Sequence, residues 1–78
     1  MRLSRRDVQR ARAALERRLQ EILSPEELQV VEDAVPEAAR LGDQWTLSRA
    51  LLDINDKIER DPIAGPIRGG LYRYYARR

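Results

Sequence analysis

The chain of 78 residues has a net charge of +2 and contains neither cysteine nor histidine. A chain of this length forms one domain, and the two missing residue types exclude disulfide bonds and the usual ligands of a zinc site. We therefore expect a small domain without metal or cofactor, stabilised by well-packed helices or by another subunit.

Hydropathy indicates no membrane segment. The longest apolar runs have three or four residues, far fewer than the roughly twenty needed to cross a bilayer, and the first residues lack the apolar region of a secretory signal. The absence of cysteine fits a reducing compartment. The expectation is a soluble, cytoplasmic protein.

Charge is segregated along the chain. Residues 1–23 carry a net +4, residues 24–61 carry −6, and residues 62–78 carry +4 with no acidic residue. Such asymmetry is typical of a basic surface for phosphates or for an acidic partner. It is equally typical of segments that attract each other in the folded chain, and the sequence leaves both interpretations open.

The first predicted helix begins after Ser4. Ser4 and Asp7 have the spacing of a capping box, and Leu3 and Val8 that of a hydrophobic staple. At 100° per residue, the apolar positions on one face are Val8, Ala11, Leu15, Leu19 and Ile22. The positions on the opposite face are Arg6, Arg10 and Arg17.

The second predicted helix begins after Ser24, with Pro25 in its first position and Glu27 completing a capping box. Its wide apolar face, which suits a central helix, comprises Leu28, Val31, Ala34, Val35 and Ala38. Pro36 lacks a backbone N–H, so we expect a kink or a break near Val35. Gly42 has the position of a helix C-terminal cap.

The third predicted helix begins near Asp43 or Thr46 and ends before Asp61 and Pro62. Its apolar stripe comprises Leu47, Ala50, Leu51, Ile54 and Ile58. Trp45 and Leu52 project together from the reverse face. This second apolar patch needs a cover, which is either a partner or the rest of the chain.

The last segment, residues 62–78, holds three of the four glycines and all three tyrosines. Pro66 and the pair Gly69 and Gly70 argue against one continuous helix here, while residues 71–78 alone are compatible with a strand, a short helix or disorder. The predicted fold is an all-α, small three-helix bundle over residues 1–61, its middle helix kinked or broken at Pro36, followed by a non-helical basic C-terminal tail over residues 62–78.

Catalysis is not indicated. Histidine and cysteine, the commonest acid–base and nucleophilic side chains, are absent. Ser4 and Ser24 are explained as helix caps. Asp53 to Asp56 lacks the central glycine and the closing glutamate of a calcium loop. We therefore expect that the protein is not an enzyme.

The leading functional hypothesis is an accessory protein that docks onto a larger protein or complex. Trp, Tyr and Arg dominate binding hot spots, and they gather in the tail and on the spare face of the third helix. The expected partner-binding residues are Trp45, Leu52, Arg68, Tyr72, Arg73, Tyr74, Tyr75, Arg77 and Arg78. Self-association of the chain stays open, and so does a tail that folds back over Trp45.

The alternative hypothesis is binding to RNA or DNA. Arginines alternate with tyrosines in the tail, which suits phosphate neutralisation and base stacking on a single strand. Arg6, Arg10 and Arg17 would extend this track along the first helix. A helix-turn-helix over residues 36–60 is a weaker variant, because its reading helix would lie in the acidic segment and repel DNA.

Overall fold

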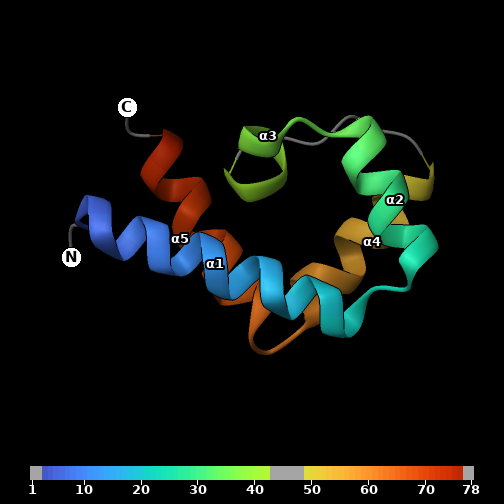
Figure 1. Cartoon of the computed structure of the whole chain (residues 1–78), viewed down its shortest axis with the longest axis horizontal. Helices are drawn as coiled ribbons and strands as arrows, with labels where there is room; N and C mark the ends of the chain where they lie inside the picture. The colour runs from blue at the N-terminus through green and yellow to red at the C-terminus, as the bar shows by residue number, and fades with distance from the viewer. Residues whose placement is uncertain (1–2, 43–48, 77–78) are drawn as a thin grey trace.

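The computed structural model describes residues 3–42 and 49–76, and every regular element among them is a helix (Figure 1). The five helices in these two ranges are α1 (Arg5–Ile22), α2 (Pro25–Ala34), α3 (Glu37–Gly42), α4 (Arg49–Arg60) and α5 (Ala64–Ala76). The predicted all-α class is confirmed, whereas the three-helix arrangement with a non-helical tail is not. None of the described helices is long and apolar enough to cross a membrane.

Both predicted capping boxes are present. The Ser4 Oγ accepts a hydrogen bond from the Asp7 backbone N–H at 3.1 Å, and the Ser4 backbone N–H donates to Asp7 Oδ2 at 3.2 Å. Ser24 and Glu27 repeat this exchange at the start of α2, at 3.1 and 2.8 Å. The hydrogen bonds from the cap backbone hold the pKa of the Asp7 and Glu27 carboxyls below their ordinary values.

The predicted break at Pro36 is confirmed. Helix α2 ends at Ala34, Val35 is extended, and α3 begins at Glu37. Because Pro36 disfavours a helical conformation at the residue before it, the chain turns here and starts a new helix. The predicted start of the third helix, near Asp43 or Thr46, lies outside the described residues.

The predicted non-helical tail is wrong, because Ala64–Ala76 forms α5. Pro66 is the third residue of this helix. The first four backbone N–H groups of a helix have no acceptor within the helix. The missing N–H of Pro66 therefore costs α5 no intrahelical hydrogen bond. Gly69 and Gly70 each cost about 1 kcal/mol relative to alanine. Packing of α5 against the rest of the chain offsets this cost.

The core draws buried side chains from all five of the described helices. Helix α5 packs against α1, α3 and α4, while α2 packs against α4 and α1. The fully buried large side chains are Leu15, Leu41, Ile58, Leu71 and Val31. The last helix therefore contributes Leu71, together with Ala64, to the same core as the first.

Most of the predicted core positions are confirmed. Those buried are Val8, Leu15, Leu19, Val31, Val35, Leu51, Ile54 and Ile58, and those half-buried are Ala11, Ile22 and Leu28. Ala34 and Ala50 are exposed, which contradicts the prediction: they lie at the margins of their helices' apolar faces, and their single methyl groups gain little from burial. The side chains of Ala38 and Leu47 lie outside the described part of the chain.

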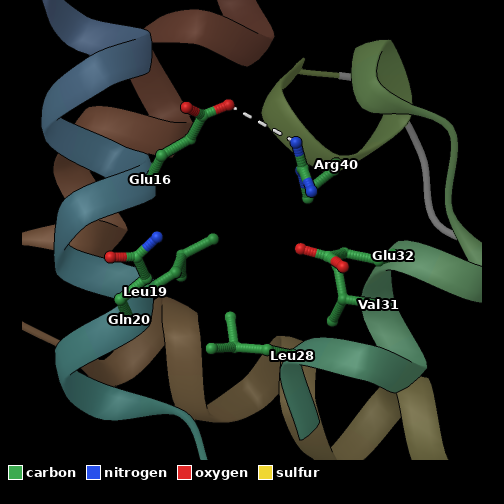
Figure 2. A pocket seen from close by; sticks show the side chains of 7 residues that line it. All are labelled: Glu16, Leu19, Gln20, Leu28, Val31, Glu32 and Arg40. Atoms are coloured by element: carbon green, nitrogen blue, oxygen red, sulfur yellow. Dashed lines mark hydrogen bonds and ion pairs between the residues drawn. The ribbon is translucent and has the colours of Figure 1, made fainter. Parts of the chain in front are cut away.

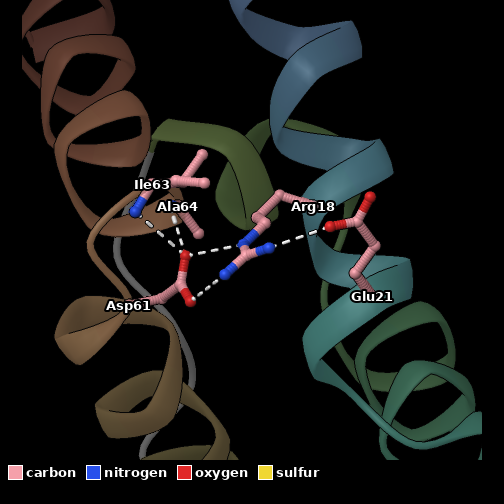
Figure 3. Close-up of polar contacts among 5 residues, drawn as sticks. All are labelled: Arg18, Glu21, Asp61, Ile63 and Ala64. Carbon is pink, nitrogen blue, oxygen red and sulfur yellow. Dashed lines mark hydrogen bonds and ion pairs between the residues drawn. The ribbon is translucent and has the colours of Figure 1, made fainter.

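Ion pairs connect the basic first helix to acidic groups later in the chain. Arg12 of α1 pairs with Glu37 of α3, and Arg18 of α1 pairs with Asp61 at the start of the last turn before α5 (Figure 3). Lys57 of α4 pairs with Glu27 of α2 at 3.0 Å. Attraction between segments of the folded chain thus accounts for part of the charge segregation.

Candidate functional site

Tyr72 and Arg73 lie on the solvent side of α5. The Tyr72 side chain is 42% exposed, and Arg73 is also exposed. On the helix wheel they belong to an arc centred opposite Ala64 and Leu71, the two buried residues of α5. We call this arc the outer face of α5 and define it by Pro66, Gly69, Tyr72, Arg73 and Ala76.

The outer face of α5 has an open surface at its centre. A Cβ atom built on Gly69 would meet no heavy atom within 4 Å, and the same holds for the neighbouring Gly70. Neither glycine has a positive φ. Neither position therefore needs a glycine, either for its backbone conformation or for packing among the described residues. Both glycines nevertheless weaken the helix.

Gly65 is a different case. A Cβ atom at this position would lie 2.5 Å from the backbone carbonyl oxygen of Glu59. Helix α5 thus approaches the end of α4 so closely that only glycine fits. Packing therefore requires glycine at position 65, whereas Gly69 and Gly70 are half-buried and leave room for a Cβ.

The other tyrosines of the last helix contribute to packing. Tyr74 and Tyr75 are half-buried and pack against the core. Their rings meet edge to face with centroids 5.3 Å apart. Arg68 is also half-buried: burial lowers the pKa of its guanidinium, and the negative charge of Glu59 partly offsets this. The predicted partner-binding residues of α5 therefore lie on two sides of the helix. Arg68, Tyr74 and Tyr75 are on its inner side, and Tyr72 and Arg73 are on its outer face.

The remaining predicted binding residues are dispersed. Leu52 is 49% exposed on α4. Arg6, Arg10 and Arg17 are exposed on α1, on the side opposite Val8 and Leu15. Both sets point away from the core, each from its own helix. Trp45, Arg77 and Arg78 lie outside the described residues.

Asp61 is a structural residue that sequence analysis did not single out. Its Oδ2 accepts hydrogen bonds from the backbone N–H groups of Ile63 and Ala64 at 3.0 and 2.8 Å, so it caps the start of α5. The same carboxylate binds Arg18 (Figure 3). The signal was present: Asp61 followed by Pro62 repeats the arrangement of Ser24 and Pro25, a cap followed by proline.

No protein-family model matches this chain, and no curated protein or solved structure matches it with statistical significance. Among the described residues, no three acidic side chains gather as a set that could hold a metal ion.

Proposed function

We propose that this protein is a non-enzymatic accessory protein that docks onto a larger protein through the outer face of α5. The observation that carries the proposal is the position of Tyr72 and Arg73 beside Gly69 on one exposed face of a helix that is anchored by Leu71. A helix fixed by its buried side presents its other side in a defined orientation, which lowers the entropy cost of binding.

The side chains on this face suit a protein interface. Tyrosine and arginine are among the residues that contribute most to binding energy, and a tyrosine orders few torsions when it is buried. The two glycines add space, because a partner backbone can approach a helix closely where no Cβ projects. Close approach of a partner would explain why glycines that weaken the helix stand at these two positions.

Leu52 on α4 is a second exposed apolar contact in this proposal. Together with Trp45 it forms the spare face inferred from the sequence, and the part that depends on Trp45 lies outside the described residues. Arg68, Tyr74 and Tyr75 support the docking helix from its inner side.

A photo-crosslinking experiment tests the docking surface. A benzophenone amino acid replaces Tyr72 in one variant and Leu52 in a second, and it replaces the exposed Glu26 of α2 in a control, because α2 has no extensive contact with α5. We expect irradiation in host cells to yield one protein adduct from position 72 and none from position 26. Equal adducts from positions 72 and 26 would contradict the proposal.

The partner identified in this way allows a quantitative test. With the purified partner, replacing both Tyr72 and Arg73 by alanine should weaken binding at least about tenfold, because hot-spot residues contribute upwards of 2 kcal/mol each. The denaturation midpoint should change little, since both side chains are exposed. Unchanged affinity in a folded double variant would exclude the outer face of α5 as the docking surface.

Nucleic-acid binding is the second candidate, and the exposed Arg6, Arg10 and Arg17 favour it. Binding through phosphates weakens steeply as salt rises, whereas a contact anchored by tyrosine does not. Replacing these three arginines by glutamine should leave the protein adduct at position 72 intact. If nuclease treatment abolishes that adduct, the nucleic-acid function replaces the docking function.

A further inference from the structure

The outer side of α1 presents two arginines that take no part in the ion pairs among the described residues. Arg10 and Arg17 are exposed, and so is Ala13 between them, on the side of the helix that is turned away from its buried residues. Asp7, three residues before Arg10, is engaged by the Ser4 cap. We define the outer side of α1 by Arg10, Ala13 and Arg17.

The outer side of α2 presents two carboxylates at the same spacing. We define it by Glu26, Val30 and Asp33, which are exposed and lie opposite the buried Val31. Neither carboxylate forms an ion pair with a described residue, although Asp33 accepts a hydrogen bond from Nε2 of Gln29 at 2.7 Å. Val30 between them is 37% exposed, so covering it would remove apolar surface from water.

Asp33 lies where its charge disfavours its own helix. It belongs to the last turn of α2, which contains no basic residue. The last turn is the negative end of the helix dipole, where a carboxylate is unfavourable and a cation is favourable. An arginine from outside the monomer would pair with this carboxylate and also interact favourably with the end of the helix. The position of Asp33 therefore suits an interface better than it suits an isolated chain.

The two outer sides match when the helices run antiparallel. The charged residues are seven positions apart on each helix, which is roughly 10.5 Å at a rise of about 1.5 Å per residue. The facing pairs are then Arg17 with Glu26, Ala13 with Val30, and Arg10 with Asp33. The small alanine leaves room for the larger valine, and each arginine faces a carboxylate. In the parallel direction Ala13 would face Gln29 instead of Val30.

We propose that the protein forms a two-fold symmetric dimer in which the outer side of α1 of one copy packs antiparallel on the outer side of α2 of the other. Two-fold symmetry repeats the contact, so every ion pair forms twice. Both complementary surfaces belong to this chain, and a second copy therefore supplies the match without a foreign partner. None of the contacting residues belongs to the outer face of α5, so the dimer does not depend on the proposed docking.

The crosslinking control at position 26 is compatible with this dimer. The benzophenone amino acid replaces Glu26 and so removes one ion pair from each of the two contacts. The remaining contact is small, and small contacts with exposed ion pairs are weak. The absence of an adduct from position 26 is therefore expected with or without the dimer.

Sedimentation velocity of the full chain measures the dimer directly. In about 20 mM salt, where screening is weak, the sedimentation coefficient should rise with protein concentration toward that of a dimer. We expect a Kd of roughly 1 mM or below, as is typical of a small polar contact. In about 0.5 M salt the ion pairs are screened, and the chain should be monomeric. A chain that stays monomeric up to about 1 mM in low salt overturns the proposal.

A pair of charge-reversal variants tests which residues meet. Arg17→Glu and Glu26→Arg should each weaken the dimer at least about tenfold, because like charges then face each other in both contacts. A 1:1 mixture of the two variants should restore the dimer, since each glutamate then faces an arginine. Arg49→Glu and Asp53→Arg make the same changes of charge at exposed positions of α4, and each should leave the Kd within about threefold of the wild type. Failure of the mixture to restore the dimer overturns the proposal.

Two further arms complete the test. If circular dichroism shows that Glu26→Arg is unfolded, Arg10→Glu and Asp33→Arg replace the first pair of variants, and Asp33→Arg removes a charge that disfavours α2. The wild-type measurement is made on nuclease-treated protein, with and without an added oligothymidylate. A dimer that forms in the treated protein supports the proposal. Association that requires the oligonucleotide means that the arginines bind phosphates, and it overturns the proposal.

Discussion

The guanidinium of Arg18 in α1 forms two hydrogen bonds with the carboxylate of Asp61, from Nε to Oδ2 at 3.0 Å and from Nη2 to Oδ1 at 2.9 Å (Figure 3). Asp61 also caps α5 through the N–H groups of Ile63 and Ala64. One carboxylate therefore determines both where the last helix begins and how it is held against the first helix.

This arrangement predicts a dependence of stability on pH. The hydrogen bonds from Arg18, followed by those from the backbone of Ala64 and Ile63, hold the pKa of Asp61 well below its ordinary value of 3.8. A carboxyl whose pKa is lowered on folding stabilises the protein fully above its unfolded pKa, and this contribution is lost as the pH falls further. The denaturation midpoint should therefore decrease below about pH 4.

The Asp61→Asn variant isolates this contribution. Denaturation in urea over a series of pH values should show a lower midpoint than the wild type at neutral pH and a weaker decrease in acid. Glu21→Gln is the matched control, because Glu21 also pairs with Arg18, at 2.8 Å, but is largely exposed, and exposed ion pairs contribute little. If the two variants have the same pH profile, Asp61 does not have the role described.

Ser24 is expected to determine the start of α2. Ser24→Ala removes the acceptor of the Glu27 N–H and should lower the free energy of unfolding by roughly 0.5–2 kcal/mol. Gln29→Ala, at an exposed position of the same helix, should change it by less than about 0.5 kcal/mol. Chemical denaturation measures both, and an unchanged midpoint for Ser24→Ala would show that the cap has no role in stability.

The glycines of α5 should respond in opposite directions to alanine substitution. Gly65→Ala places a methyl group against the carbonyl of Glu59 and should destabilise the protein by roughly 1–3 kcal/mol. Gly69→Ala meets open space and should stabilise it by roughly 0.5–1 kcal/mol. Thermal denaturation distinguishes the two, and destabilisation by Gly69→Ala would mean that the outer face of α5 is not open.

Gly69→Ala also bears on the proposed docking. If a partner backbone approaches this position, the substitution should weaken binding to the partner although it stabilises the free protein. Affinity measured with the purified partner tests this expectation. A variant that is more stable and binds at least as tightly would show that the glycine is not kept for close approach.

The sequence predicted the features whose stabilising interactions are local. The capping boxes at Ser4 and Ser24 connect residues three positions apart, and Pro36 acts on its immediate neighbour, so each could be predicted without knowledge of the fold. The core faces of α1 and α4 were predicted for the same reason, because their apolar residues follow the helical period.

The last helix could not be predicted in this way. Local preference opposes a helix at Pro66, Gly69 and Gly70, and α5 forms because Leu71 and Ala64 are buried against α1, α3 and α4. Pro66 is acceptable only if the helix begins close before it, which depends on the cap at Asp61. The shallow pocket lined by Glu16, Glu32 and Arg40 (Figure 2) had no local signal either, since these residues come from three helices that only the tertiary structure brings together.

Helix α5 has a buried inner side, which holds it against the rest of the fold, and an exposed outer face. Leu71 and Tyr72 are neighbours in sequence on these two sides, the first fully buried and the second exposed. The most direct test is the free energy of unfolding of Leu71→Ala and Tyr72→Ala, measured side by side by chemical denaturation. We expect a loss of roughly 2–5 kcal/mol for Leu71→Ala and of less than about 1 kcal/mol for Tyr72→Ala. Similar losses for the two variants, or a larger loss for Tyr72→Ala, would show that α5 is not divided into a buried inner side and an exposed outer face.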